Sequence, residues 1–201
     1  MTDPARPFIL GIGGTPKPRS SSEKALEISL AAAAGEGAET LLIGGDDLIM
    51  PMYTAPVNSQ TAEVARLLVA MRRADGIIIS SPAYHGSISG LLKNALDYTE
   101  EMRTDERPYF DGKPVGLISC AAGWQGAGQT LQALRSIVHA LRGWPTPLGA
   151  VINTSLPVFD SGGEVVDISA KFQLETVGRQ VMQFCRWQQQ SDFQPARAMA
   201  V

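Results

Sequence analysis

Short apolar segments bounded by glycine or proline recur along this chain. They are continuous runs rich in isoleucine, leucine and valine, without strict alternation of apolar and polar positions. The runs cover residues 8–13, 39–43, 76–81, 114–120 and 147–152. Runs of this kind are typical of strands that are buried on both faces, as in a parallel sheet. The pattern therefore predicts five parallel strands.

Segments of helical periodicity separate these runs. Val64, Leu67, Leu68 and Met71, for example, fall at the i, i+3, i+4, i+7 spacing of one helix face. Five helices are expected, over the alanine-rich segment 22–34 and around the apolar stripes at 64–71, 88–99, 131–141 and 172–187. Strands that alternate with helices predict βαβ units, right-handed crossovers and a doubly wound sheet.

Residues 153–169 fit neither pattern. Pro157 and the run Asp160-Ser161-Gly162-Gly163 stand between two apolar stretches, which predicts an irregular hairpin. No internal repeat or linker is visible elsewhere. We therefore expect one domain over residues 1–190, followed by a flexible tail over residues 191–201.

Charge and composition narrow the functional classes. Seventeen basic and 20 acidic residues give a net charge of −3, which argues against non-specific binding of nucleic acid. No apolar run is long enough for a transmembrane helix. The segment 1–7 lacks the apolar core of a signal peptide, so a cytoplasmic location is expected. The chain has two cysteines, Cys120 and Cys185, and two histidines, which argues against a disulfide scaffold or a metal site.

Glycine is abundant, with 20 residues in 201 against an average of ~7%. Ligands of open parallel sheets bind beyond the carboxyl ends of the strands, so the segments that follow the strands are informative. The first of these, GGTPKPRSSS at residues 13–22, combines hydroxyl groups, one lysine and one arginine before a helix start. Free amides, the helix dipole and hydroxyl donors make such a segment a candidate phosphate site. The alternative is a serine-rich turn that merely caps the helix.

The usual phosphate motifs are absent from this segment. GxGxxG would need glycine where Pro16 stands, and GxxxxGK[ST] does not occur. A dinucleotide Rossmann site and a P-loop nucleotidase therefore lose support.

The segments after the third and fourth strands are SSPAYHGSISGLLKNALD at residues 80–97 and CAAGWQGAG at residues 120–128. The second of these is interpreted as a loop before a helix. Together the three segments indicate a phosphate end and a planar-ring end, as in a flavin mononucleotide site.

The chain resembles the NADPH-dependent FMN reductase family, a branch of the flavodoxin-like superfamily. The run PAYHGSISGLLKNALD at residues 82–97 carries most of the resemblance, supported by residues 13–22, 51–53 (PMY) and 112–119 (GKPVGLIS). The similarity extends over residues 8–185. It implies a three-layer α/β sandwich with a five-stranded parallel sheet in the order 2-1-3-4-5 and helices on both faces.

The resemblance also implies the cofactor site. The first segment would bind the FMN phosphate, the second would line the isoalloxazine, with amides near His85 and Gly86 donating to its N5 and O4 side, and the third would approach the pyrimidine edge. The residues concerned are Thr15, Arg19, Ser20, Ser21, Ser22, Pro82, Ala83, Tyr84, His85, Gly86, Ser87, Ala122, Gly123 and Trp124. No catalytic side chain and no metal are expected, because flavin N5 carries the chemistry. The first segment departs from the family in having Thr15 and two prolines before Arg19, so the phosphate could meet either Lys17 or Arg19.

Two residues of the second segment each allow two interpretations. His85 belongs to the ligand loop or faces solvent in a turn, and Tyr84 stacks on the flavin or covers the core. Cys120 is expected to be a free cysteine of the core. Lys93, Asn94 and Asp97 follow the family helix that packs in a dimer interface.

The function expected from this resemblance is that of an FMN-dependent oxidoreductase. NADPH or NADH would pass a hydride to flavin N5, and a second acceptor (free FMN, a quinone, an azo compound or a metal oxyanion) would take the electrons in a ping-pong cycle. The alternative is a flavodoxin-like electron carrier that serves a protein partner. A protein that lost the cofactor and a hydrolase are weaker alternatives, the latter because Ile88 replaces the serine of a GxSxG elbow. A homodimer or homotetramer is expected.

Overall fold

A parallel sheet forms the centre of the molecule. The structure is a computed structural model that describes residues 6–55 and 61–190, so the tail expected over residues 191–201 lies outside the described part. The strands are β1 (Phe8–Gly13), β2 (Glu39–Gly44), β3 (Gly76–Pro82), β4 (Pro114–Ala121), β5 (Trp144–Pro145) and β6 (Ala150–Asn153). Their order is β2-β1-β3-β4-β5, with β6 also paired to β4 and every pairing parallel. The predicted order 2-1-3-4-5 is confirmed.

The fifth strand is interrupted, and of the strand expected over residues 147–152 only residues 150–152 belong to a strand. Its first piece, β5, pairs with the start of β4, and its second piece, β6, pairs with the end of β4. Pro147 stands between the pieces and has no N–H to donate to a ladder. The side chain of Arg135 donates to the carbonyls of Thr146 and Pro147 at 3.3 and 3.0 Å, so the polar groups of the break remain paired.

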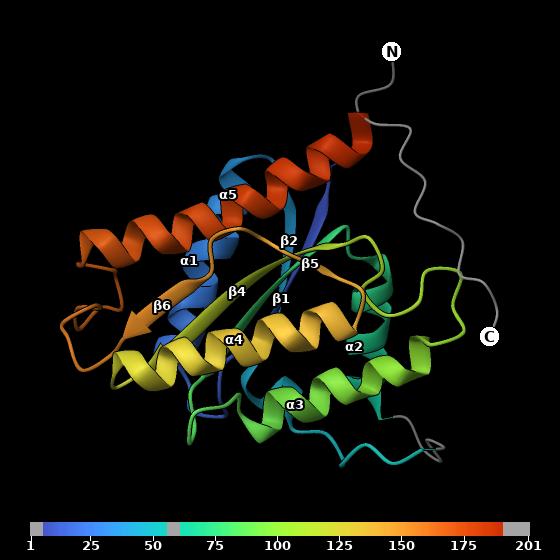
Figure 1. Cartoon of the computed structure of the whole chain (residues 1–201), viewed down its shortest axis with the longest axis horizontal. Helices are drawn as coiled ribbons and strands as arrows, with labels where there is room; N and C mark the ends of the chain where they lie inside the picture. The colour runs from blue at the N-terminus through green and yellow to red at the C-terminus, as the bar shows by residue number, and fades with distance from the viewer. Residues whose placement is uncertain (1–5, 56–60, 191–201) are drawn as a thin grey trace.

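Helices cover both faces of the sheet (Figure 1). One face carries α1 (Ser21–Gly35) and α5 (Ile168–Gln190), and the other carries α2 (Ala62–Arg73), α3 (Gly90–Asp97) and α4 (Trp124–Ala140). Short 3-10 helices follow β2 (η1, Gly45–Leu48) and α3 (η2, Tyr98–Met102). Hydroxyl side chains of Ser20, Thr61 and Ser89 cap the first three long helices by accepting backbone amides. No described helix has the length and apolar character needed to cross a membrane.

Two helices differ from the predicted boundaries. The stripe over residues 88–99 is shared between α3 and the 3-10 helix η2, so the regular helix is shorter than expected. Helix α4 begins at Trp124, before the stripe at residues 131–141. The part of α4 before the stripe contains Gly126 and Gly128. Glycine has a low helix propensity, so the sequence did not predict a helix there.

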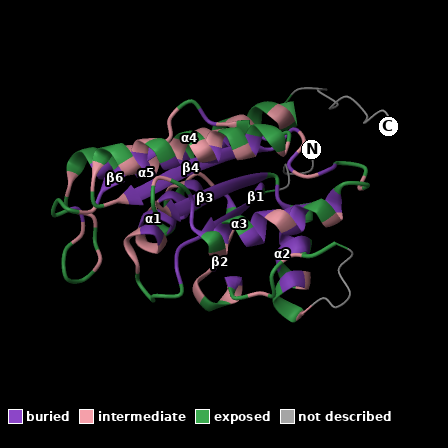
Figure 2. Ribbon diagram, turned by 60° about the horizontal axis from the view of Figure 1, so that its bottom comes forward, coloured by how far each residue is buried: buried purple, intermediate pink, exposed green. Residues whose placement is uncertain are grey.

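The core consists of two clusters separated by the sheet. Successive strand residues point to opposite faces, so Leu10 and Ile12 of β1 pack with α2, α3 and α4, whereas Ile9 packs with α1 and α5. Figure 2 shows the sheet and the inward helix faces buried and the outward faces exposed. Burial on both faces explains why the strands read as continuous apolar runs.

Lys113 is a charged residue inside this core. Its side chain is 2% exposed and its Nζ donates to the carbonyls of Met71 and Arg72 at the end of α2. Burial lowers the pKa of Lys113 to about 8. An unfolded lysine titrates near ~10.4, so between these values the unfolded chain binds more protons than the folded one, and stability rises with pH.

Comparison with a Lys113→Met variant tests this linkage. The wild-type free energy of unfolding, minus that of the variant, is expected to rise by about 2 kcal/mol between about pH 7.5 and 9.5, because one pKa unit corresponds to ~1.4 kcal/mol. Urea unfolding of both proteins at both pH values measures the difference. A difference that does not change with pH would show that the ammonium group is not destabilised by burial.

Candidate functional site

Three loops meet at the carboxyl edge of the sheet. They comprise residues 14–20 after β1 (the first loop), 83–89 after β3 (the second loop) and 122–123 after β4 (the third loop). They lie together because β1, β3 and β4 are adjacent and parallel. Backbone bonds join them to neighbouring strands: the amide of Gly14 donates to Ser80 at 3.2 Å, and the amide of Ala83 donates to Cys120 at 2.8 Å.

The first loop leaves backbone amides free at the start of α1. The hydroxyl of Thr15 accepts from the amide of Lys17 at 3.2 Å, and the hydroxyl of Ser20 accepts from the amide of Glu23 at 3.3 Å. The amides of Ser21 and Ser22 have no partner in the described part of the chain. A helix start with two unpaired amides beside the one that Ser20 caps favours a bound anion.

Basic side chains surround this loop. Arg19 and Lys17 are exposed, and Lys24 lies over the ring of Phe159 with its Nζ 5.5 Å from the ring centroid. Arg19 has a positive φ of 55° and donates from Nη2 to the carbonyl of Gly162. Its contact with a distant segment of the chain distinguishes Arg19 from Lys17. One carboxylate oxygen of Glu23 is buried in the same region without a hydrogen-bond partner.

The second loop contains a tight turn with two unpaired amides. Tyr84 and Ser87 bond to each other through both backbone groups, at 3.0 and 3.1 Å. His85 and Gly86 between them have φ values of 52° and 81°, as a type I′ turn requires. Their amides bond to nothing in the parts of the chain that the structure covers. The turn therefore presents two adjacent N–H donors.

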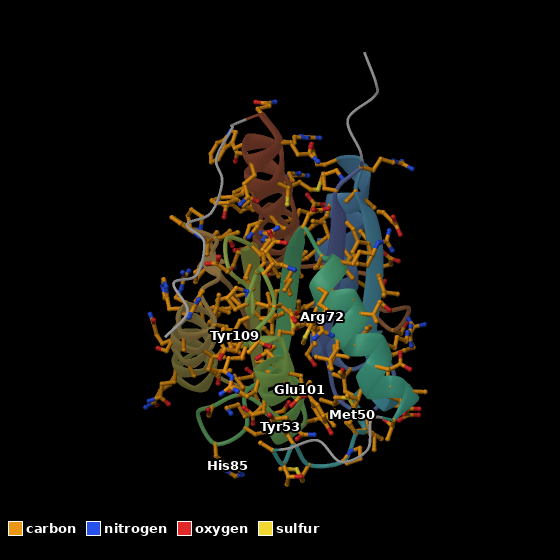
Figure 3. All side chains as sticks on the ribbon, turned by 90° about the vertical axis from the view of Figure 1, so that its right-hand side faces the viewer. Met50, Tyr53, Arg72, His85, Glu101 and Tyr109 are labelled. Carbon is orange, nitrogen blue, oxygen red and sulfur yellow. The ribbon has the colours of Figure 1, made fainter. Side chains whose placement is uncertain are left out.

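The side chains of this turn are open to solvent. Tyr84 is 54% exposed, and Pro82 and Ala83 are half-buried. His85 is exposed and lies at the outer margin of the molecule (Figure 3). A Cβ at Gly86 would stand 2.7 Å from Oε1 of Gln129 on α4, so glycine allows the turn to lie close to that helix.

The third loop is shorter than predicted. Ala122 and Gly123 alone connect β4 to α4, whereas Trp124, Gly126 and Gly128 belong to the helix rather than to a loop. No side chain caps α4, so its first amides have no side-chain acceptor. Trp124 is 59% exposed.

Cys120 lies at the end of β4 as a free, buried thiol, as expected. Burial raises the pKa of Cys120 to about 12, so it stays protonated near neutral pH and is a poor nucleophile. Among the described residues, no group of three His, Cys, Asp or Glu side chains could hold a metal ion.

Asn94 joins α3 to the segment 51–53, a contact that the sequence did not predict. It is buried on α3, where its Oδ1 accepts from the amide of Tyr53 at 2.8 Å and its Nδ2 donates to the carbonyl of Pro51 at 2.9 Å. The hydroxyl of Tyr53 donates to Glu101 at 3.1 Å, and the two side chains lie together in Figure 3. Asn94 therefore fixes the segment PMY against α3. The contact pairs residues far apart in sequence, so no local signal predicts it.

The hairpin of residues 158–167 also reaches the first loop. Its predicted form is confirmed by an antiparallel bridge between Phe159 and Val165. It lies at the end of the sheet to which β6 points (Figure 1). The turn composition was visible in the sequence, but its contact with Arg19 was not.

Comparisons with known proteins agree with this geometry. The family model described as NADPH-dependent FMN reductase matches residues 7–155. An NAD(P)H-dependent FMN reductase of Pseudomonas aeruginosa is 28% identical over 183 residues, which cover 89% of this chain and 94% of that protein. An FMN-dependent NADPH-azoreductase of Staphylococcus aureus is 41% identical over 88 residues, or 44% of this chain and 40% of that protein.

Solved structures show the same fold. The flavoenzyme NAD(P)H:(acceptor) oxidoreductase FerB of Paracoccus denitrificans superposes with a TM-score of 0.75 at 20% identity, over 90% of this chain and 98% of that chain. The family match covers β1 to β6 and all three loops of the site. The chain therefore belongs to the NADPH-dependent FMN reductase family, which makes the protein an oxidoreductase that works with FMN and NAD(P)H.

Proposed function

We propose that this chain holds FMN across the three loops and uses it to carry electrons from NAD(P)H to a second acceptor in a ping-pong cycle. When bound, FMN supplies the redox chemistry, which is hydride acceptance at N5 and release of the electrons to the acceptor. The observation that carries the proposal is the set of unpaired amides at two neighbouring places, Ser21 and Ser22 at the start of α1 and His85 and Gly86 on the second loop.

The first loop suits the phosphate end of FMN. The free amides of Ser21 and Ser22 and the dipole of α1 favour an anion. Thr15 and Ser20 shape the loop through their hydroxyl groups, and Arg19 can add a charge-assisted bond. We assign Thr15, Arg19, Ser20, Ser21 and Ser22 to the phosphate.

The second and third loops suit a flat ring. The amides of His85 and Gly86 are adjacent donors for acceptor atoms at one ring edge, and the uncapped N-terminus of α4 favours negative charge on the ring. Pro82 at the end of β3 and Ala83, Tyr84 and Ser87 of the second loop would also face the ring. Ala122 and Gly123 of the third loop and Trp124 at the start of α4 would approach it from the other side. We infer that the backbone, rather than any titratable side chain, tunes the cofactor.

The exposed character of the site supports a broad choice of acceptor. Tyr84 and Trp124 are each more than half exposed, so little of the chain covers the ring position. We propose free FMN, a quinone, an azo compound or a metal oxyanion as the acceptor. A cytoplasmic location and a homodimer or homotetramer remain predictions.

Flavin binding and reduction test the proposal directly. The purified chain is expected to quench the fluorescence of added FMN, and anaerobic NADPH or NADH is expected to bleach the bound flavin in a stopped-flow experiment. A panel of acceptors then identifies which compound restores the yellow colour. A chain that binds no FMN would refute the proposal. Bound FMN that only a protein donor can reduce would instead favour the electron carrier.

A further inference from the structure

The hairpin of residues 158–167 is internally fixed. The amide of Gly163 donates to the carbonyl of Asp160 at 3.1 Å, and the amide of Asp160 donates to the carbonyl of Glu164 at 2.9 Å. The carboxylate of Asp160 also accepts from the amide of Glu164 at 2.9 Å. The tip of the hairpin is therefore a defined turn and not an open loop.

The hairpin contacts two cations, Arg19 of the first loop and Lys24 of α1, through neutral groups. The carbonyl of Gly162 accepts from Nη2 of Arg19, and the ring of Phe159 lies against Nζ of Lys24. Neither Arg19 nor Lys24 forms an ion pair within the described residues. The hairpin thus holds Arg19, the residue before the N-cap of α1, and contacts Lys24 without pairing either with an opposite charge.

We propose that the hairpin is a clamp that positions Arg19 for the FMN phosphate and so makes the chain select FMN over riboflavin. This inference rests on the proposed FMN site. A guanidinium has five N–H donors, and the bond to Gly162 uses one of them. The others remain for a phosphate, which guanidinium groups bind with two parallel bonds. Because the side chain is held in place before the ligand arrives, less freedom is lost on binding.

Gly163 is the residue on which the clamp depends. It has a φ of 96°, and a Cβ there would stand 2.5 Å from Nη2 of Arg19 and 3.2 Å from Cε of Lys24. Alanine at this position would push the guanidinium away from its place. Gly37 offers a matched control, because it has a φ of 97° and nothing within 4 Å of the corresponding Cβ. The two substitutions share the backbone strain and differ in the contact with Arg19.

The test compares the affinity of the full chain for FMN and for riboflavin by quenching of flavin fluorescence. Gly163→Ala is expected to weaken FMN about tenfold, a loss of ~1.4 kcal/mol, and to leave riboflavin within about twofold. Gly37→Ala is expected to leave the FMN to riboflavin ratio as in the wild type. An unchanged ratio in Gly163→Ala, or an equal loss for both flavins, would overturn the clamp.

A second variant keeps the inference testable if Gly163→Ala folds poorly. Arg19→Lys keeps the charge but lacks the guanidinium fork, so it is expected to lose most of the FMN preference. In an Arg19→Ala background, Gly163→Ala is expected to cause no further change in the ratio, because both changes act on one group. Additive losses would overturn the clamp. Wild-type protein that binds neither flavin would remove the proposed function and the clamp together.

Discussion

Replacing Gly13 by alanine is expected to lower the free energy of unfolding by about 4 kcal/mol and to abolish flavin binding. Gly13 ends β1 with a φ of 148°, and a Cβ there would overlap the carbonyl oxygen of Ser80 and stand 2.8 Å from its carbonyl carbon. Backbone strain costs ~1–3 kcal/mol and overpacking a further ~1–3 kcal/mol. Because the obstacle is the backbone of β3, the first loop must move to relieve it.

Gly11 provides the control on the same strand. A Cβ at Gly11 would meet Cδ1 of Leu30 at 2.6 Å, which is the far end of a flexible side chain. Gly11→Ala is therefore expected to cost about 2 kcal/mol less than Gly13→Ala. Urea unfolding and FMN titration of both variants measure the difference. Equal stability losses, or a Gly13→Ala variant with normal FMN affinity, would contradict this account of the first loop.

Gly178→Ala, at the contact between α1 and α5, is expected to lower the free energy of unfolding by about 3 kcal/mol. For a chain of this size that lowers Tm by roughly 10 °C. Gly178 lies where α5 crosses α1, and a Cβ would overlap the carbonyl oxygen of Ser29 and stand 3.2 Å from Cβ of Ala32. The hydroxyl of Ser29 donates to the carbonyl of Leu174 at 2.7 Å across the same crossing. An added methyl group would therefore separate two helices that are also hydrogen-bonded.

Gly128→Ala is the matched control for this substitution. Gly128 also lies inside a helix, but nothing stands within 4 Å of its Cβ position. Since alanine has the higher helix propensity, the variant is expected to gain up to ~1 kcal/mol. Thermal unfolding of both variants separates the helix-propensity effect from the contact. A Gly178→Ala protein as stable as Gly128→Ala would show that α1 and α5 do not cross this closely.

The fold was predictable because its signals are local. Leu10 and Ile12 on one face and Ile9 on the other read together as one apolar run, which in a strand means burial on both faces. The run at residues 147–152 predicted a strand that starts too early, because the strand β6 begins only at Ala150 and Pro147 has no N–H for a ladder. The start of α4 was missed because Gly126 and Gly128 weaken the helix signal locally, although tertiary packing forms the helix there.

The site was predictable only in part. The segments that form the loops were recognisable from their composition, and the parallel sheet explains why they meet at one edge. The free amides of His85 and Gly86 could not be read from the sequence, since they depend on the φ values of the turn. The same holds for the buried role of Asn94, which joins α3 to a segment more than 40 residues away.

The sequence by itself determined the doubly wound topology, the three segments that follow strands at one edge of the sheet and the family resemblance, because periodicity, turn residues and motif spacing are properties of neighbouring residues. Only the tertiary structure decided that Gly162 accepts a hydrogen bond from Arg19 and that α1 and α5 touch at Gly178. It alone also placed the buried ammonium group of Lys113 against the carbonyl groups at the end of α2. These contacts join residues that are distant along the chain. They exist only once the packed sheet has brought its helices and loops together, so no local pattern encodes them.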